Sequence, residues 1–120
     1  MRIVLADNRS EVRAALRLLI QHRSALQVVG ETGDMDGVRG CLDAAAPDLL
    51  LVEWKMLGRL PAPVLADLHA HYPRLRVIVM SGHPGARLAA LEAGADAFVS
   101  KTNPPEQLLE VLDGCRAEQD

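Results

Sequence analysis

The stretch Pro47-Asp-Leu-Leu-Leu-Val-Glu-Trp54 places four consecutive apolar residues directly before a lone glutamate. A run that is apolar at every position is typical of a strand that is covered on both faces. Similar short runs occur before and after it in the chain, and one of them alternates more, as suits the edge of a sheet. The sequence therefore predicts five strands, at residues 3–6, 26–30, 49–52, 77–80 and 97–99, with the second at an edge.

Between these runs the apolar residues recur with the helical period of about 3.6 residues. They define five helices, marked by Val12, Ala15, Leu16 and Leu19; by Met35, Val38, Leu42 and Ala45; by Pro61, Leu65, Leu68 and Tyr72; by the stretch from Pro84 to Gly94; and by Leu108, Val111, Leu112 and Cys115. Alternating strands and helices indicate a parallel sheet with right-handed crossovers and helices on both faces. We expect one α/β domain over residues 1–120, a doubly wound, flavodoxin-like (βα)5 sheet with strand order 2-1-3-4-5.

Composition excludes several classes of partner. The chain has a net charge of −3 and only three aromatic residues, so it lacks the basic, aromatic groove of a nucleic-acid binder. No apolar run reaches the roughly 20 residues that a membrane span needs, and the apolar run after Arg2 stops at Asp7, unlike a signal peptide. Cys41 and Cys115 have no paired spacing and are expected to be free thiols. We therefore expect a cytoplasmic domain that binds neither membrane nor nucleic acid.

Polar residues follow four of the five predicted strands: Asp7 and Asn8, Glu53, Ser81, and Lys101. In a sheet of this kind, ligands bind beyond the carboxyl ends of the strands. Each residue also has a simpler interpretation. Asn8 with Glu11 can form a capping box, Ser81 can be a turn residue, and Lys101 can be a solvated loop lysine. Glu53 is harder to explain in this way, because a lone buried carboxylate is costly.

Taken together, these segments resemble the receiver domain of bacterial two-component response regulators over the whole chain. The matching stretches are residues 2–8, with the acidic pair; 47–54, with the phosphoacceptor position; 77–83, with the switch hydroxyl; and 94–101, with the aromatic switch residue and the lysine. Residues 102–109 resemble the subfamily whose receivers precede a helix-turn-helix output domain.

The resemblance implies roles for these residues. Asp7, Asn8 and Glu53 would occupy the Mg²⁺ site, Glu53 the phosphoacceptor position, and Lys101 the position that contacts the phosphoryl group. Ser81 and Phe98 would be the switch residues.

Two departures from the family pattern put the chemistry in doubt. Glu53 stands in place of the acceptor aspartate, and its carboxylate lies about 1.5 Å further out, where a misplacement of about 1 Å can cost on the order of 10²-fold in rate. Asn8 replaces the second acid, so Mg²⁺, which favours carboxylates, should bind weakly or not at all. Leu57 also replaces the usual proline of the following loop. We expect a pseudo-receiver with no catalytic residues and no cofactor, or weakly bound Mg²⁺ at most.

Alternatives to the pseudo-receiver remain open. One is a phosphoacceptor that works through Glu53, and another is a small flavodoxin-like enzyme or cofactor-binding domain. The longer side chain of Glu53 can also imitate a phosphoryl group in part.

The expected partners are proteins. If the domain does no chemistry, its output must be a surface that acts through a protein partner or a fused output domain, with an effect on transcription. In the family, the fourth helix, fifth strand and fifth helix commonly form a homodimer. Here that face carries mixed charge, on Arg87, Glu92, Asp96, Glu106 and Glu110. An ordinary solvated face is the alternative.

Overall fold

Five parallel strands form one sheet in the order β2-β1-β3-β4-β5 in the computed structural model, which describes residues 1–119. The predicted order and the edge position of the second strand are confirmed. The strands are β1 (Arg2–Ala6), β2 (Gln27–Thr32), β3 (Leu49–Glu53), β4 (Arg76–Ser81) and β5 (Ala97–Ser100). β2 begins and ends later than predicted, and its pairing with β1 shifts register between Ile3 and Val4.

The helices fall where the periodicity placed them, with two differences. They are α1 (Ser10–Gln21), α2 (Met35–Ala45), α3 (Pro61–His71), α4 (Ala86–Glu92) and α5 (Pro105–Gln119). α4 is shorter than the predicted stretch because Pro84 lies in a turn before it, and Gly94, at a φ of 114°, lies beyond its end. A short 3-10 helix, η1 (Trp54–Leu57), follows β3 and was not predicted.

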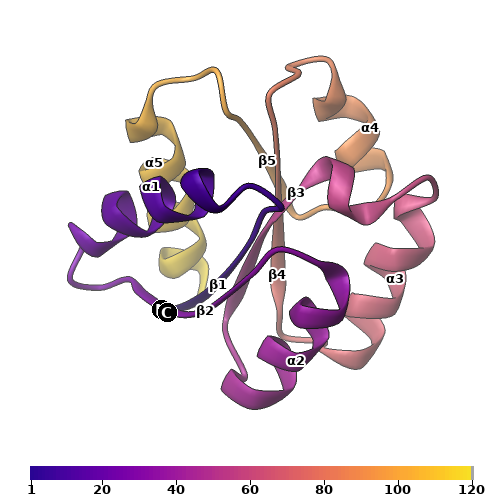
Figure 1. The fold of residues 1–120 in the computed structure, drawn as a ribbon, viewed down its shortest axis with the longest axis horizontal. Helices are drawn as coiled ribbons and strands as arrows, with labels where there is room; N and C mark the ends of the chain where they lie inside the picture. The colour runs from indigo at the N-terminus through magenta and orange to yellow at the C-terminus, as the bar shows by residue number, and fades with distance from the viewer. Residues whose placement is uncertain (120) are drawn as a thin grey trace.

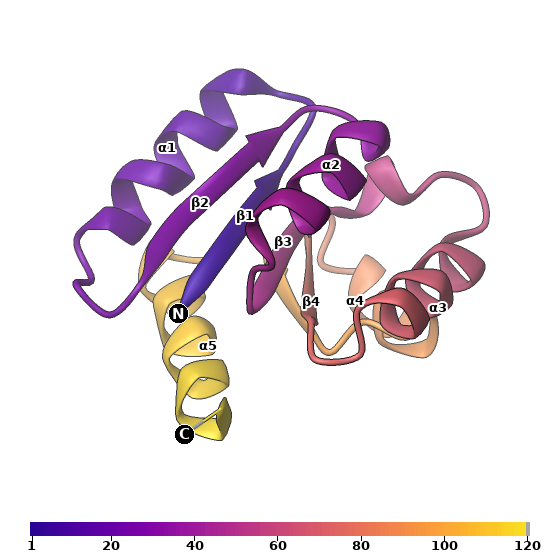
Figure 2. The same cartoon turned by 90° about the horizontal axis from the view of Figure 1, so that it is seen from below.

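Each face of the sheet carries its own hydrophobic core, because successive strand residues point to opposite faces. α1 and α5 cover one face and α2, α3 and α4 cover the other (Figures 1 and 2). In β3, Leu49 and Leu51 pack toward α1 and α5, while Leu50 and Val52 pack toward the other three helices. This explains why the strand is apolar at every position. Cys41 and Cys115 are free thiols.

None of the helices described within residues 1–119 is both long and apolar enough to cross a membrane.

The strand register aligns the carboxyl ends at one edge. Ala6 pairs with Val52, and Ser81 pairs with Ser100. Asp7, Glu53, Ser81 and Lys101 are therefore at or next to the ends of four neighbouring strands. β2 lies on one side of β1, and β3, β4 and β5 lie on the other side. The order of the strands therefore reverses at β1, and a ligand in this architecture usually binds at such a point.

Candidate functional site

Three of the residues predicted at the strand ends meet directly. Lys101 Nζ lies 2.5 Å from Asp7 Oδ2 and forms a second ion pair with Glu53 Oε2. Asp7 is fully buried, and the Glu53 side chain is 7% exposed. Two buried carboxylates would be unfavourable without a counter-charge, so the lysine compensates both. Burial lowers the pKa of Lys101, but the hydrogen bonds and charges of Asp7 and Glu53 outweigh it, and the net direction is upward.

Asp7 is also held by its own loop and by α1. Its Oδ1 accepts a hydrogen bond from the backbone N–H of Arg9 at 2.9 Å, and its backbone N–H donates to Thr32 at 3.1 Å. The guanidinium of Arg13 donates to the Asp7 carbonyl oxygen. Arg13 was missed in the sequence because its position on α1 gives no sign of which loop it reaches. The Arg9 N–H and Lys101 therefore each hold one oxygen of the carboxylate, while Thr32 and Arg13 hold the Asp7 backbone.

Asn8 lies at the rim and does not join this cluster. Its side chain is exposed, and α1 begins at Ser10 with Arg9 in the cap position and no side-chain cap. The capping-box interpretation is therefore wrong, and Glu11 instead pairs with Arg9 at 3.2 Å. The physical reason is that the chain takes one more residue before turning into the helix, which moves Asn8 away from the free N–H groups.

Ser81 lies at the end of β4, next to the cluster, and Phe98 lies within β5. Ser81 is fully buried, its Oγ accepts a hydrogen bond from the His83 backbone N–H at 3.1 Å, and its carbonyl accepts one from Lys101 N at 2.8 Å. Phe98 is 7% exposed and packs in the core on the α3 and α4 side. Ser81 is thus linked to the Lys101 backbone, and Phe98 belongs to the core and does not line the site. Their roles as switch residues stay predictions.

The residues present fit a resident Mg²⁺ poorly. Of the three positions expected to hold it, Asp7 and Glu53 share the Lys101 ammonium, and Asn8 is a neutral, exposed amide. Within residues 1–119, no three acidic, histidine or cysteine side chains gather as a metal site would require. A positive side chain thus lies between the carboxylates that would have to bind the cation.

A hollow of about 300 Å³ opens above the cluster. Besides Glu53 and Lys101, it is lined by Asn8, Arg9, Lys55, Gly82 and His83. Arg9 and Lys55 were not singled out in the sequence, although each lies within two residues of a strand-end position. Both bring positive charge to the mouth of the site.

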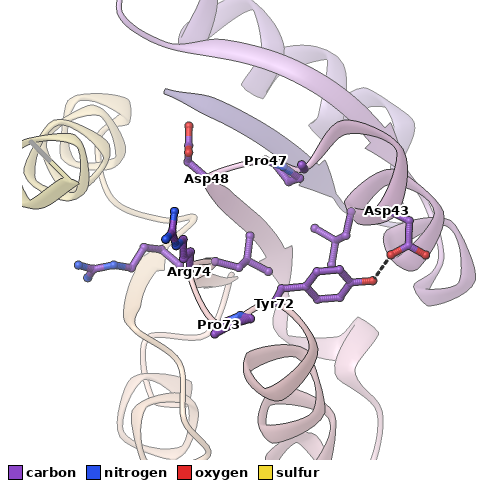
Figure 3. A pocket seen from close by; sticks show the side chains of 10 residues that line it. Asp43, Pro47, Asp48, Tyr72, Pro73 and Arg74 are labelled. Atoms are coloured by element: carbon purple, nitrogen blue, oxygen red, sulfur yellow. Dashed lines mark hydrogen bonds between the residues drawn. The ribbon is translucent and has the colours of Figure 1, made fainter.

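The larger hollow, about 1050 Å³, lies at the opposite end of the sheet, where β3 and β4 begin (Figure 3). There the Tyr72 hydroxyl donates a 2.5 Å hydrogen bond to Asp43, which raises the pKa of Tyr72. Asp43 and Asp48 balance the charges of Arg74 and Arg76 in its lining, so it favours neither anions nor cations. It lies far from the carboxyl ends where this architecture places ligands.

Comparison with known proteins agrees with the geometry. Residues 3–113 match the response regulator receiver domain family. The nitrate/nitrite response regulator protein NarL of Escherichia coli K12 is 30% identical over 112 residues, which are 92% of this chain and 52% of NarL. The chain therefore spans about half the length of that relative.

Solved structures show the same fold. The signal receiver domain of the putative response regulator NarL from Mycobacterium tuberculosis superposes with a TM-score of 0.82 at 27% identity, covering 96% of this chain and 95% of that one. A LuxR-family two-component response regulator from Aurantimonas sp. SI85-9A1 gives 0.86 at 26% identity, covering 98% and 85%. With the parallel sheet, the strand-end cluster and a family match over most of its length, this chain belongs to the response regulator receiver domain family.

Proposed function

We propose that this receiver domain is a pseudo-receiver, which takes part in two-component signalling without being phosphorylated at Glu53. The observation that supports the proposal is the buried ion pair between Glu53 and Lys101. A phosphoacceptor carboxylate has to be free to attack a donor in line with its leaving group. Here the carboxylate is engaged by the lysine, one methylene further from the backbone than an aspartate would be.

The amide of Asn8, in the position of the family's second acid, also argues against phosphorylation. Phosphoryl transfer depends on positioning and on neutralising charge, much of it through Mg²⁺. Asn8 contributes no charge, and Lys101 already offsets one of the two negative charges that remain, those of Asp7 and Glu53. Nucleophile and metal site are both altered, and the two changes fall on the same reaction.

The Glu53–Lys101 pair also gives the domain a fixed state. It ties the end of β3 to the loop after β5, as a phosphoryl oxygen bound by the lysine would. One charge replaces about two on a phosphoryl group, so the imitation is partial. The domain then signals through the surface that this state presents.

Intact-mass spectrometry after incubation with Mg²⁺ and acetyl phosphate tests the proposal. We expect no phosphoryl adduct on the wild-type chain and little on Glu53→Asp. Glu53→Asp combined with Asn8→Asp should be phosphorylated measurably, because nucleophile and metal site act as a unit. An adduct on the wild-type chain would establish the working phosphoacceptor instead, and equal yields from the single and double variants would refute the coupling.

The effect on transcription is exerted by another domain or protein. Relatives such as NarL are response regulators of about twice this length, and this domain carries a net charge of −3. We propose that the domain itself does not contact DNA and affects transcription through a fused or separate output domain. A regulatory role is favoured over an enzyme because relatives such as NarL are response regulators.

A homodimer through α4, β5 and α5 is the contact we propose for this output. Leu88 on α4 is 66% exposed and Leu91 is 37% exposed, beside the exposed charges of Arg87 and Glu92. An isologous contact can pair such mixed charges with themselves. Asp96 contributes less than its sequence position suggests, because its carboxylate is engaged by His69 and the Val77 N–H.

Sedimentation without phosphate or Mg²⁺ tests the dimer. Arg87→Glu should weaken it in a salt-dependent way. Arg59→Glu, the same change at an exposed residue outside these three elements, is the control. A wild-type chain that stays monomeric at several hundred micromolar would remove the dimer and point to a different protein partner.

A further inference from the structure

The large hollow where β3 and β4 begin lies between two turns, the one from α2 to β3 and the one from α3 to β4. Its apolar lining consists of two prolines, two buried leucines and a tyrosine ring: Pro47, Pro73, Leu42, Leu75 and Tyr72. Figure 3 shows Arg74 on one side of the hollow and Asp43 on the other, with the tyrosine ring and the prolines between them. The hollow therefore has an apolar centre, a positive side and a negative side.

The charged groups on these two sides are open to a ligand. Arg74 is exposed and makes no ion pair in the part of the chain that the structure describes. Asp43 is exposed as well, and the tyrosine hydroxyl donates to only one of its two oxygens. Arg76 and Asp48 are already engaged, by Glu118 at 2.6 Å and by a backbone N–H of β1 at 2.8 Å. Arg74 and Asp43 are thus the groups with which a charged ligand would pair.

The size and shape of the hollow favour a peptide over a small molecule. Its volume of about 1050 Å³ is above the roughly 300–1,000 Å³ of sites that enclose a small ligand. Most of the lining side chains are exposed or half-buried, so a small ligand would keep much of its surface in water. A peptide cannot bind here by adding a strand, because β3 and β4 are inner strands without a free edge. Side-chain packing and charge have to supply the recognition.

We propose that this hollow binds an extended segment of a partner protein in which an apolar residue lies between an acidic and a basic residue. The apolar residue packs among Pro47, Pro73 and Tyr72. The acidic residue pairs with Arg74 and the basic residue with Asp43, so the separation of charge fixes the direction in which the segment lies. Prolines lose little side-chain entropy when they are covered, which favours binding. The site is at the opposite end of the sheet from the strand-end cluster, and the proposal does not depend on phosphorylation there.

A titration of the full chain with short peptides at constant ionic strength tests the proposal. The chain has one tyrosine, so isotope labelling of tyrosine rings gives NMR signals from Tyr72 alone. The probes are acetyl-Glu-Pro-Leu-Pro-Lys-amide and the same residues in reverse order, and the prolines keep both peptides extended. We expect saturable shifts with a dissociation constant on the order of 1 mM for one order and weaker binding for the other. Serine in place of the peptide's leucine should raise the constant roughly tenfold, because buried apolar surface is lost.

Variants of the chain test the pairing of charges. Arg74→Glu should raise the dissociation constant of the better peptide roughly fivefold, because an exposed ion pair becomes a repulsion. A peptide with lysine at both ends should bind Arg74→Glu more tightly than it binds the wild type. Arg59→Glu, the same change at an exposed arginine outside the hollow, should leave every constant unchanged. Amide spectra of the same samples report whether each variant is folded.

Shifts that stay linear, equal binding of the leucine and serine peptides, or equal losses in Arg74→Glu and Arg59→Glu would overturn the proposal. Equal binding of the lysine-ended peptide to Arg74→Glu and to wild type would do the same. Tyr72 signals that move with protein concentration in the absence of peptide would also overturn it, because a second copy of the chain would then occupy the hollow.

Discussion

Replacing Lys101 with methionine removes the charge shared by two buried carboxylates. Asp7 is fully buried, and the Glu53 side chain is 7% exposed, so both would face each other without a counter-ion. Removing one partner of a buried ion pair costs about 3–5 kcal/mol. Because the Lys101 side chain is itself 23% exposed and water can enter when it is removed, we take the lower end, about 3 kcal/mol. For a domain of this size that lowers the Tm by about 12 °C.

Urea denaturation followed by circular dichroism measures this loss. Lys55→Met is the matched control, since Lys55 is an exposed lysine of the same pocket without an ion pair within residues 1–119, and its effect should stay within about 0.5 kcal/mol. Adding Glu53→Gln to Lys101→Met should recover part of the stability, because one uncompensated carboxylate is removed. A loss below about 1 kcal/mol for Lys101→Met, or no recovery in the double variant, would refute the idea that the lysine compensates both acids.

The pH dependence of this difference follows from the raised pKa of Lys101. A lysine whose pKa is raised on folding contributes stability that is complete below its unfolded value, about 10.4, and is lost as pH rises through the folded value. The difference in unfolding free energy between wild type and Lys101→Met should stay constant from about pH 7 to 9 and shrink only above about pH 10.4. A difference that disappears near neutral pH would contradict this assignment.

Three further substitutions test the fold around the site, each by urea denaturation. Gly37→Ala should lose about 1–2 kcal/mol despite the better helix propensity of alanine, because the new Cβ would lie 1.8 Å from Thr32 Oγ1; unchanged stability would show that Thr32 moves freely. Ala46→Gly should gain about 0.5–1 kcal/mol, since Ala46 has a φ of 45° at the end of α2; a loss would exclude left-handed strain there. Asp96→Ala should lose about 1–3 kcal/mol, because the Val77 N–H donates a 2.7 Å hydrogen bond to its carboxylate; a neutral effect would mean that water replaces the acceptor.

The sequence by itself determined the sheet and the three residues that meet at its carboxyl edge, Asp7, Glu53 and Lys101. Strands covered on both faces must be apolar throughout, so residues 49–52 could be recognised as a buried strand before the neighbouring strands were known. Parallel strands share one edge for their carboxyl ends, so Asp7, Glu53 and Lys101 could be grouped before their contacts were known. Helix ends were less certain: α4 proved shorter than predicted, and the cap proposed for Asn8 does not form.

Only the tertiary structure decided which side chains bind each other. Lys101 and Asp7 are 94 residues apart in the chain. Their contact depends on the register of the sheet, in which β1 and β5 lie on opposite sides of β3 and β4. The hydrogen bonds from Arg13 to the Asp7 carbonyl and from the Val77 N–H to Asp96 also depend on how the elements pack. The spacing of apolar residues is a local property of the sequence. The partner of a polar side chain is set by the distance and orientation of elements that meet only after folding, and that geometry pairs Glu53 with Lys101.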